Sequence, residues 1–218
     1  MRGPVSIKRR LNLAARAPFS LVLMSERIRI GTAGWATPRQ HAACFPTGGS
    51  ILSRYSARLP AVEINTSFYR SHRASTWARW AQETPNGFAF AVKAPKAVTH
   101  EAKLRDVRPL LELFRDEIAH LGPRLEVVLF QLPPSLTFNP DIAATFLEAW
   151  RTLYDGFTAL EPRHASWLDA DELLIQHRVA RVAADPPSVQ AFAKPGGWRG
   201  LSYWRWHGSA CGRSPSQF

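Results

Sequence analysis

The stretch LEVVLFQ, residues 125–131, is a short apolar run that ends in a polar side chain. Near-continuous apolar runs are typical of strands that are buried on both faces of a parallel sheet. Six further runs of this type recur along the chain, separated by segments with helical periodicity. They are residues 28–34, 61–67, 88–93, 157–161, 179–185 and 201–207. Strands that alternate with helices predict βαβ units around a parallel sheet.

Seven such units indicate the α/β class and a TIM (β/α)8-like barrel. Seven strands are visible in the sequence, and the last strand and helix of the barrel are missing from it. The chain has 218 residues, whereas barrels of this type typically have about 250, with a lower limit near 200. In this fold the functional groups lie at the C-terminal ends of the strands.

Several connecting segments carry helix-start signals. Ser50 is placed to cap one helix, and Asn139 followed by Pro140 is a capping residue with proline at the first helical position of another. Asp106 is expected to begin a longer helix. Residues 186–200 are rich in Pro and Gly and are expected to form an irregular loop with at most one helical turn.

The chain divides into one domain with a short segment at each end. Residues 1–23 contain five basic residues and no acid, and they read as a disordered leader, a transit peptide or an extended gene start. Residues 24–208 are expected to form the barrel domain. Residues 209–218 have neither strand nor helix periodicity and read as an irregular tail. No segment has the length and apolarity of a membrane span.

The formal net charge is +11, and about +6 remains without the leader, so nucleic acid is one candidate partner. The densest basic cluster is Lys93, Lys96, Lys103, Arg105 and Arg108. A site for a small anionic molecule is preferred to a nucleic-acid face, because Lys93 lies at a strand end rather than on a basic helix. Two cysteines and the lack of a CxxC motif exclude a disulfide framework, and a reducing cytoplasmic location is the default expectation.

Ionisable residues at the strand ends are the candidates for catalysis, because these ends meet at one mouth of a barrel. Glu63 lies within the second run, Glu161 ends the fifth, Asp185 ends the sixth, and His207 ends the seventh. Carboxylates and imidazoles at such positions can serve as general acids or bases. The alternative for Glu63 is a structural ion pair, with Lys93, Arg163 or Arg205 as the cation.

Further polar groups at the same ends are candidates for substrate binding: Asn65, Lys93, Gln131, Arg163, His164 and Arg205. Gln131 can both donate and accept hydrogen bonds. A partly desolvated lysine can bind an anion, or act as a base or as a Schiff-base nucleophile if its pKa is lowered, and anion binding is the more economical role. A divalent metal on the carboxylates and His207 is a variant of the enzyme hypothesis.

Seven segments together resemble the YecE-like family, domain of unknown function 72, in order and at fitting spacings. They are GTAGW (31–35), VEINTSFY (62–69), FAVKAP (90–95), TH (99–100), LFQLPPS (129–135), EPRHASW (161–167) and WRWHG (204–208). The resemblance implies a TIM barrel with polar groups at one mouth, and it brings no established activity. The family usually continues beyond the His-Gly element with another helix and strand, whereas this chain ends in a short tail.

Three hypotheses for function therefore remain. The first is an enzyme that binds a small anionic or polyol-like substrate and uses acid/base or metal-assisted chemistry, as a hydrolase, lyase or isomerase. The second is a nucleic-acid-binding module. The third is an inactive product of a truncated gene.

Overall fold

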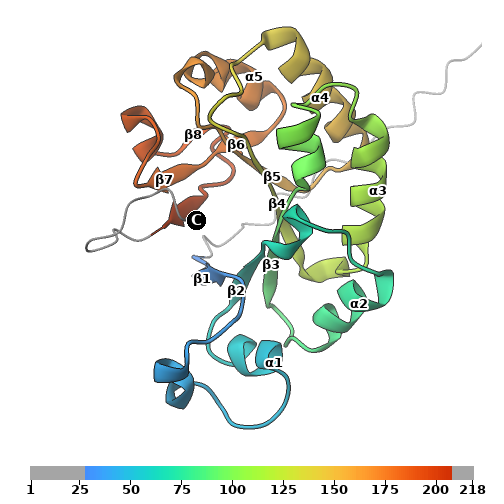
Figure 1. Ribbon diagram of the computed structural model, residues 1–218, viewed down its shortest axis with the longest axis vertical. Coiled ribbons are helices and arrows are strands. Elements are labelled where there is room, and N and C mark those ends of the chain that lie inside the picture. Colours follow the sequence, from blue (N-terminus) through green and yellow to red (C-terminus); the bar gives the residue numbers. More distant parts are fainter. Residues whose placement is uncertain (1–27, 208–218) are drawn as a thin grey trace, which may run out of the picture.

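The predicted alternation of strands and helices is present in the computed structural model, which describes residues 28–207 (Figure 1). The strands are β1 (Gly31–Ala33), β2 (Ala61–Ile64), β3 (Ala89–Lys93), β4 (Leu125–Gln131), β5 (Phe157–Glu161), β6 (Val179–Arg181), β7 (Ala183–Asp185), β8 (Gly196–Gly197) and β9 (Trp204–Trp206). The helices are α1 (Ile51–Ser56), α2 (Ala74–Gln82), α3 (Arg108–Ala119), α4 (Pro140–Leu153) and α5 (Asp171–Gln176). Figure 1 shows the helices along the outer side of the curved sheet.

The main sheet has seven strands in the order β1-β2-β3-β4-β5-β6-β8. Strands β1 to β6 are parallel, as expected for successive βαβ units, whereas β8 runs antiparallel to β6. A separate parallel pair is formed by β7 and β9. Among residues 28–207 no strand covers the outer edges of β1 and β9, so this part of the chain shows no closed barrel.

The strand predicted at residues 179–185 is divided in two at Val182. The Val182 amide donates to the Leu160 carbonyl of β5 at 3.0 Å, and the next amide, of Ala183, donates to the Tyr203 carbonyl at 2.9 Å. The backbone thus changes its partner from one strand to another at this point. The prediction of one continuous strand was wrong because alternating apolar residues do not reveal a change of pairing partner.

Three further boundaries differ from the prediction. β2 ends at Ile64, and Asn65 precedes a 3₁₀ turn, so Asn65 does not continue the strand alternation. α3 begins at Arg108, because Asp106 has a positive φ of 51°. The region 186–200 contains the expected single turn, at Gln190–Ala193, together with the short strand β8.

Two predicted caps are confirmed. The Ser50 hydroxyl accepts a hydrogen bond from the Ser53 amide at 3.1 Å and caps α1. The Asn139 side chain accepts one from the Ile142 amide at 3.0 Å, and Pro140 is the first residue of α4. No helix within residues 28–207 is long and apolar enough to cross a membrane.

The sheet separates two apolar clusters of unequal size. Residues such as Phe90, Val128 and Phe130 belong to a large cluster that includes the helix residues Trp77 and Trp150. The alternate positions of the sheet contribute to a small cluster of Val127, Leu129, Ala159 and Val182, against which Tyr203 packs. Because side chains alternate along a strand, the polar residues two positions beyond this small cluster project on its side of the sheet.

Candidate functional site

Polar side chains follow the small apolar cluster on the same face of the sheet, because side chains alternate along each strand. In β4, Val127 and Leu129 lead to Gln131, and in β5, Ala159 leads to Glu161. Gln131 and Glu161 are paired in the register of these two strands. Glu63, Lys93, Gln131 and Glu161 are all buried. The C-terminal ends of four neighbouring strands therefore bring polar groups together.

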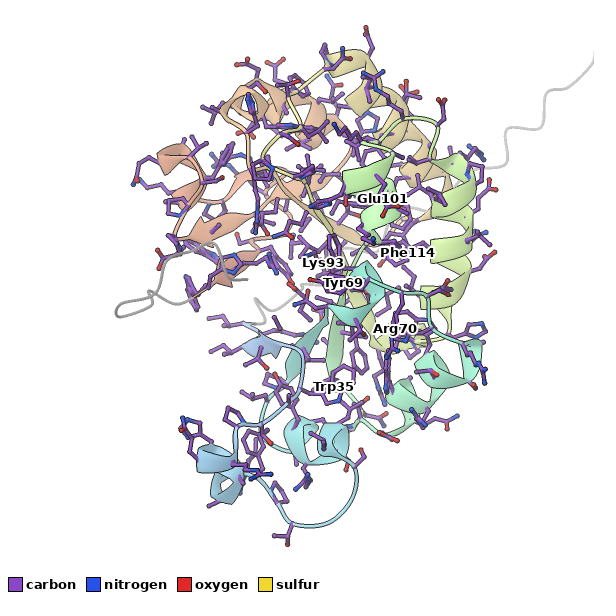
Figure 2. The ribbon with its side chains drawn as sticks, in the orientation of Figure 1. Trp35, Tyr69, Arg70, Lys93, Glu101 and Phe114 are labelled. Atoms are coloured by element: carbon purple, nitrogen blue, oxygen red, sulfur yellow. The ribbon has the colours of Figure 1, made fainter. Side chains whose placement is uncertain are left out.

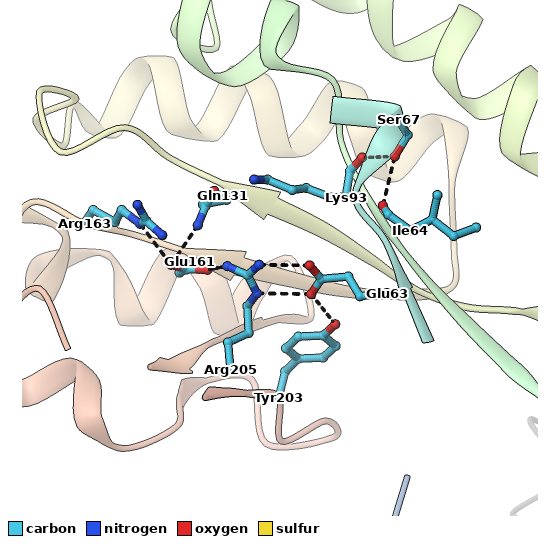
Figure 3. Close-up of polar contacts among 9 residues, drawn as sticks. All are labelled: Glu63, Ile64, Ser67, Lys93, Gln131, Glu161, Arg163, Tyr203 and Arg205. Carbon is cyan, nitrogen blue, oxygen red and sulfur yellow. Dashed lines mark hydrogen bonds and ion pairs between the residues drawn. The ribbon is translucent and has the colours of Figure 1, made fainter. Parts of the chain in front are cut away.

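Arg205 of β9 connects the two buried carboxylates (Figure 3). Its Nε and Nη2 atoms donate to Glu63, at 3.1 and 2.9 Å, and its Nη1 atom donates to Glu161. The Arg205 side chain is 9 % exposed, and those of Glu63 and Glu161 are 8 % and 3 % exposed. A buried charge must be paired to be tolerated, and here one guanidinium pairs two carboxylates.

Three other side chains complete the hydrogen bonding of the carboxylates. The Tyr203 hydroxyl donates to Glu63 at 2.9 Å. Gln131 donates its amide N–H to Glu161 at 3.1 Å, and Arg163 donates through Nε at 3.0 Å. The two carboxylates therefore accept hydrogen bonds from donors on β4 and β9, on the segment after β5 and on the segment before β9.

The pairing shifts the pKa values of the partners. Burial alone would raise the pKa of Glu161, but the charges of Arg205 and Arg163 and the hydrogen bond from Gln131 outweigh it and hold the pKa below its ordinary value. Burial, together with the Glu63 carboxylate, raises the pKa of Tyr203 well above its ordinary value. At neutral pH, Glu161 is therefore ionised and Tyr203 is a hydrogen-bond donor.

Lys93 is the buried cation of the site that has no carboxylate partner. Its amine forms no hydrogen bond or ion pair with residues 28–207, and it lies 3.8 Å from the centre of the Phe68 ring. Burial, followed by the charge of Arg205, lowers the pKa of Lys93 to about 8 despite the opposing effect of Glu63. Figure 3 shows the Lys93 side chain extending toward Gln131, and Figure 2 places it near the middle of the molecule.

The remaining predicted site residues lie outside this network. The His207 amide donates to the Asp185 carbonyl at 2.8 Å, which aligns the ends of β9 and β7. The Asp185 residue is exposed and its carboxylate forms no hydrogen bond with the described residues. His164 Nδ1 contacts the hydroxyl and amide of Ser166, so this ring caps a 3₁₀ turn. Asn65 Oδ1 is buried and finds no partner within residues 28–207.

His207 is nevertheless electrostatically coupled to the network. Desolvation and the charge of Arg205 lower the pKa of its imidazole, with Glu161 acting in the opposite direction. A neutral imidazole at pH 7 can accept a proton. The charges of the network therefore act on the His207 imidazole, although the residue itself is exposed.

The sequence reasoning missed three residues of this region. Tyr203 lies two positions before Arg205, and the alternation that placed Arg205 in the mouth also places Tyr203 there. Phe68 and His100 had no such signal: their rings meet edge to face at a centroid distance of 4.9 Å, and Phe68 also carries the Lys93 contact. These contacts depend on a 3₁₀ turn and a π-helical turn between strands.

The predicted metal ligands do not form a metal site in this arrangement. Within residues 28–207, no three carboxylate, imidazole or thiolate side chains are grouped so that they could hold a metal ion. Glu63 and Glu161 are turned toward Arg205, whose cationic group lies between them. A divalent cation at the same place would meet electrostatic repulsion from this guanidinium.

Comparisons with known proteins agree on one family. The family model described as "Protein of unknown function DUF72" matches residues 29–217. The UPF0759 protein YunF of Bacillus subtilis is 32% identical over 149 residues, which are 64% of this chain and 52% of YunF. The UPF0759 protein YecE of Escherichia coli K12 is 31% identical over 176 residues, 77% of this chain and 62% of YecE. The chain thus spans between half and two thirds of these relatives.

Two crystal structures of a DUF72 family protein from Enterococcus faecalis V583 have the same fold. Their TM-scores to this chain are 0.65 and 0.66, each at 20% sequence identity. The matches cover 84% and 87% of this chain and 75% and 74% of those chains. The similarity supports the parallel α/β architecture without transferring an activity.

Proposed function

We propose that this chain, which belongs to the DUF72 family of proteins of unknown function, binds a small anionic molecule at the C-terminal ends of its parallel strands. The observation that carries the proposal is a surplus of positive charge in the buried cluster. Glu63 and Glu161 supply two negative charges, whereas Arg205, Arg163 and Lys93 supply three positive charges. Arg205 and Arg163 pair with the carboxylates, so Lys93 is the cation in excess. The ligand that balances this charge is a carboxylate or a phosphate.

Lys93 and Arg163 are the groups that retain donors for such a ligand. Lys93 has three N–H groups and no protein acceptor within the described residues. Arg163 uses Nε for Glu161, and its two terminal nitrogens form no hydrogen bond with residues 28–207. A guanidinium that is 31% exposed and partly immobilised by an ion pair can offer these nitrogens to an anion with little loss of side-chain entropy.

The predicted acid/base residues take different roles in this proposal. Glu63 and Glu161 both accept hydrogen bonds from Arg205 and fix its guanidinium, so they position the site rather than transfer protons. His207 is the candidate base, because its imidazole is neutral at pH 7 and its pKa responds to the charges of Arg205 and Glu161. Gln131 orients Glu161, and Asp185 and Asn65 have no assigned role in this proposal.

We also infer that the described strands belong to a TIM-barrel-like arrangement. β1 to β6 follow one another in parallel order, the parallel pair β7–β9 continues the series, and the polar cluster lies at the C-terminal ends, where such barrels place their sites. One strand between β9 and β1 would complete the ring.

Isothermal titration calorimetry with inorganic phosphate at pH 7 tests the proposed binding. The Lys93→Gln and Arg163→Gln variants are each expected to weaken phosphate affinity about 10- to 100-fold, the value of one charge-assisted hydrogen bond. Lys96→Gln is the matched control, since Lys96 is exposed and pairs with Glu101 at 2.8 Å. Equal affinity in all four proteins would overturn the proposal.

Two alternatives are tested by the same proteins. If the site binds a polyol, glycerol should bind with a measurable heat, and its affinity should be the same in the wild type and in Lys93→Gln. A nucleic-acid-binding module predicts affinity for a single-stranded oligonucleotide that falls steeply with salt and survives Lys93→Gln. Either outcome, without phosphate binding, would replace the proposed function.

A further inference from the structure

We propose that the amine of Lys93 forms an imine with the carbonyl group of an anionic aldehyde, ketone or 2-oxo acid. This inference rests on the proposed function, because the anionic group of the compound would be held by Arg163 while Lys93 is released from anion binding to act as a nucleophile. The class of ligand is thereby narrowed from an anion to an anionic carbonyl compound.

The first support is the fixed position of Lys93 at the end of β3. Its carbonyl accepts a hydrogen bond from the Ser67 hydroxyl at 2.7 Å, and the next amide, of Ala94, donates to the Leu129 carbonyl at 2.8 Å. The residue is 8% exposed. A nucleophile must be held by a rigid element to meet a bound carbonyl at a constant angle, and the backbone of Lys93 satisfies this condition.

The second support is the lack of a counterion for the buried amine. The two nearest carboxylates, of Glu63 and Glu161, are both engaged by Arg205. The Lys93 amine faces the ring of Phe68 instead. Because a desolvated ammonium without a partner loses its proton more readily, the pKa of Lys93 is about 8, and a substantial fraction of the amine is neutral near pH 8.

Lys96, three positions along the chain, has the opposite environment. It is exposed, and its ion pair with Glu101 raises its pKa. Figure 2 shows Glu101 apart from Lys93. The chain therefore contains a reactive and an unreactive lysine that are close in sequence and differ in burial and pairing.

The third support is a neutral imidazole that contacts the same aromatic ring as the amine. The His100 ring contacts the same Phe68 ring that carries Lys93, and its Nδ1 lies 2.8 Å from the Thr99 hydroxyl. Burial, followed by the charge of Lys93, lowers the pKa of His100, so its imidazole is neutral at pH 7. We assign to His100 the transfer of the proton from Lys93 to the departing oxygen, because its neutral imidazole contacts the same aromatic ring as the amine.

The reaction is a balanced condensation. The lone pair of Lys93 Nζ attacks the carbonyl carbon, the C=O π bond breaks, and a proton moves from nitrogen to oxygen to give a carbinolamine. The second amine proton is then transferred to the hydroxyl group, which leaves as water while the C=N bond forms. Amine and carbonyl give imine and water, and no oxidant or reductant is consumed.

Pyridoxal 5′-phosphate is a suitable probe because it combines an aldehyde with a phosphate, and pyridoxal is the matched probe that lacks the phosphate. The full chain is incubated with a limiting amount of each at pH 7.5, treated with sodium borohydride, and digested for mass spectrometry. The chain has only five lysines, Lys8, Lys93, Lys96, Lys103 and Lys194, so each can be quantified.

We expect Lys93 to be labelled about tenfold or more faster than Lys96 by pyridoxal 5′-phosphate, because its neutral fraction is much larger. The preference for Lys93 over Lys96 is expected to be smaller when pyridoxal is the probe, and smaller in the Arg163→Gln variant. Lys93→Arg should lose the label, because a guanidinium forms no imine with the probe, and Lys96→Arg should change neither the labelling of Lys93 nor phosphate binding.

The outcomes separate this inference from the proposed function. Phosphate binding by calorimetry with uniform labelling of the lysines would overturn the imine and leave the anion site intact. Selective labelling of Lys93 with equal rates for the two probes would support a reactive lysine and contradict the anion site. Uniform labelling without phosphate binding would overturn both.

Discussion

The guanidinium of Arg205 donates two hydrogen bonds to the carboxylate of Glu63, a residue 142 positions earlier in the chain. Neither β2 nor β9 is a sheet neighbour of the other, so this ion pair joins two strands that no backbone hydrogen bond connects. Through Glu161 the same guanidinium also reaches β5. Side-chain hydrogen bonds of Arg205 therefore connect β9 to β2 and β5 at the C-terminal ends of these strands.

Removal of Arg205 is expected to destabilise the protein strongly. Arg205→Ala leaves the buried carboxylates of Glu63 and Glu161 without their common cation, and breaking a buried pair in this way costs about 3–5 kcal/mol. Urea unfolding at pH 7 measures the loss. Arg108→Ala is the control, because Arg108 forms an exposed pair with Glu112 and its removal should cost less than about 1 kcal/mol. Equal effects of the two substitutions would contradict the described network.

The Tyr203 hydroxyl should contribute to stability through Glu63. Tyr203→Phe removes a donor to a buried carboxylate and is expected to lower the free energy of unfolding by about 1–3 kcal/mol. Tyr154→Phe is the matched control, since the Tyr154 hydroxyl donates no hydrogen bond within residues 28–207. A thermal-unfolding series of the two variants and the wild type decides the matter. A larger loss of stability in Tyr154→Phe than in Tyr203→Phe would contradict this prediction.

Acid should weaken the protein through Glu161. The pKa of Glu161 is lower in the folded state than in the unfolded chain, so its contribution is fully present above its unfolded pKa, about 4.5, and is lost as the pH falls through the folded value. The difference in unfolding free energy between wild type and Glu161→Gln should be constant between pH 5 and 7 and decrease below that window. A difference that grows on acidification would contradict the direction of the shift.

The buried amine of Lys93 should lower the free energy of unfolding. Its pKa is about 8 in the folded state and 10.5 in the unfolded chain, so the folded state disfavours the bound proton. Lys93→Met is expected to raise the free energy of unfolding at pH 7 by about 1–3 kcal/mol and to weaken phosphate binding about 10- to 100-fold. The gain should vanish as the pH rises from 8 to 10.5, and Lys96→Met should show no such dependence. A Lys93→Met variant that is less stable at pH 7 would refute this interpretation.

Much of the site could be predicted from strand ends alone. Parallel strands present their C-terminal residues at one edge, so Glu63, Lys93, Gln131 and Glu161 had to approach one another once the runs were read as successive strands. Arg205 followed from the alternation in the last run. These residues are brought together by backbone geometry, which the period of the sequence encodes.

The parts that could not be predicted depend on irregular backbone. Val182 changes the pairing partner of its strand, and Ser67 links the 3₁₀ turn after β2 to the carbonyl of Lys93, which places Phe68 beside the amine. His164 Nδ1 contacts the hydroxyl and amide of Ser166, a contact that the sequence pattern did not indicate. Such side-chain to backbone contacts are local choices that hydrophobic periodicity does not specify.

The most direct test of the anion site is its affinity for sulfate, whose charge is constant between pH 7 and 9.5. Calorimetry of the wild type should show an affinity that falls as the pH rises through about 8, because Lys93 loses its positive charge there. Lys93→Arg, which stays protonated, should bind sulfate equally at both ends of this range. Two results would contradict a site built on Lys93. One is a wild-type affinity that does not change with pH, and the other is an affinity of Lys93→Arg that falls with pH as the wild-type affinity does.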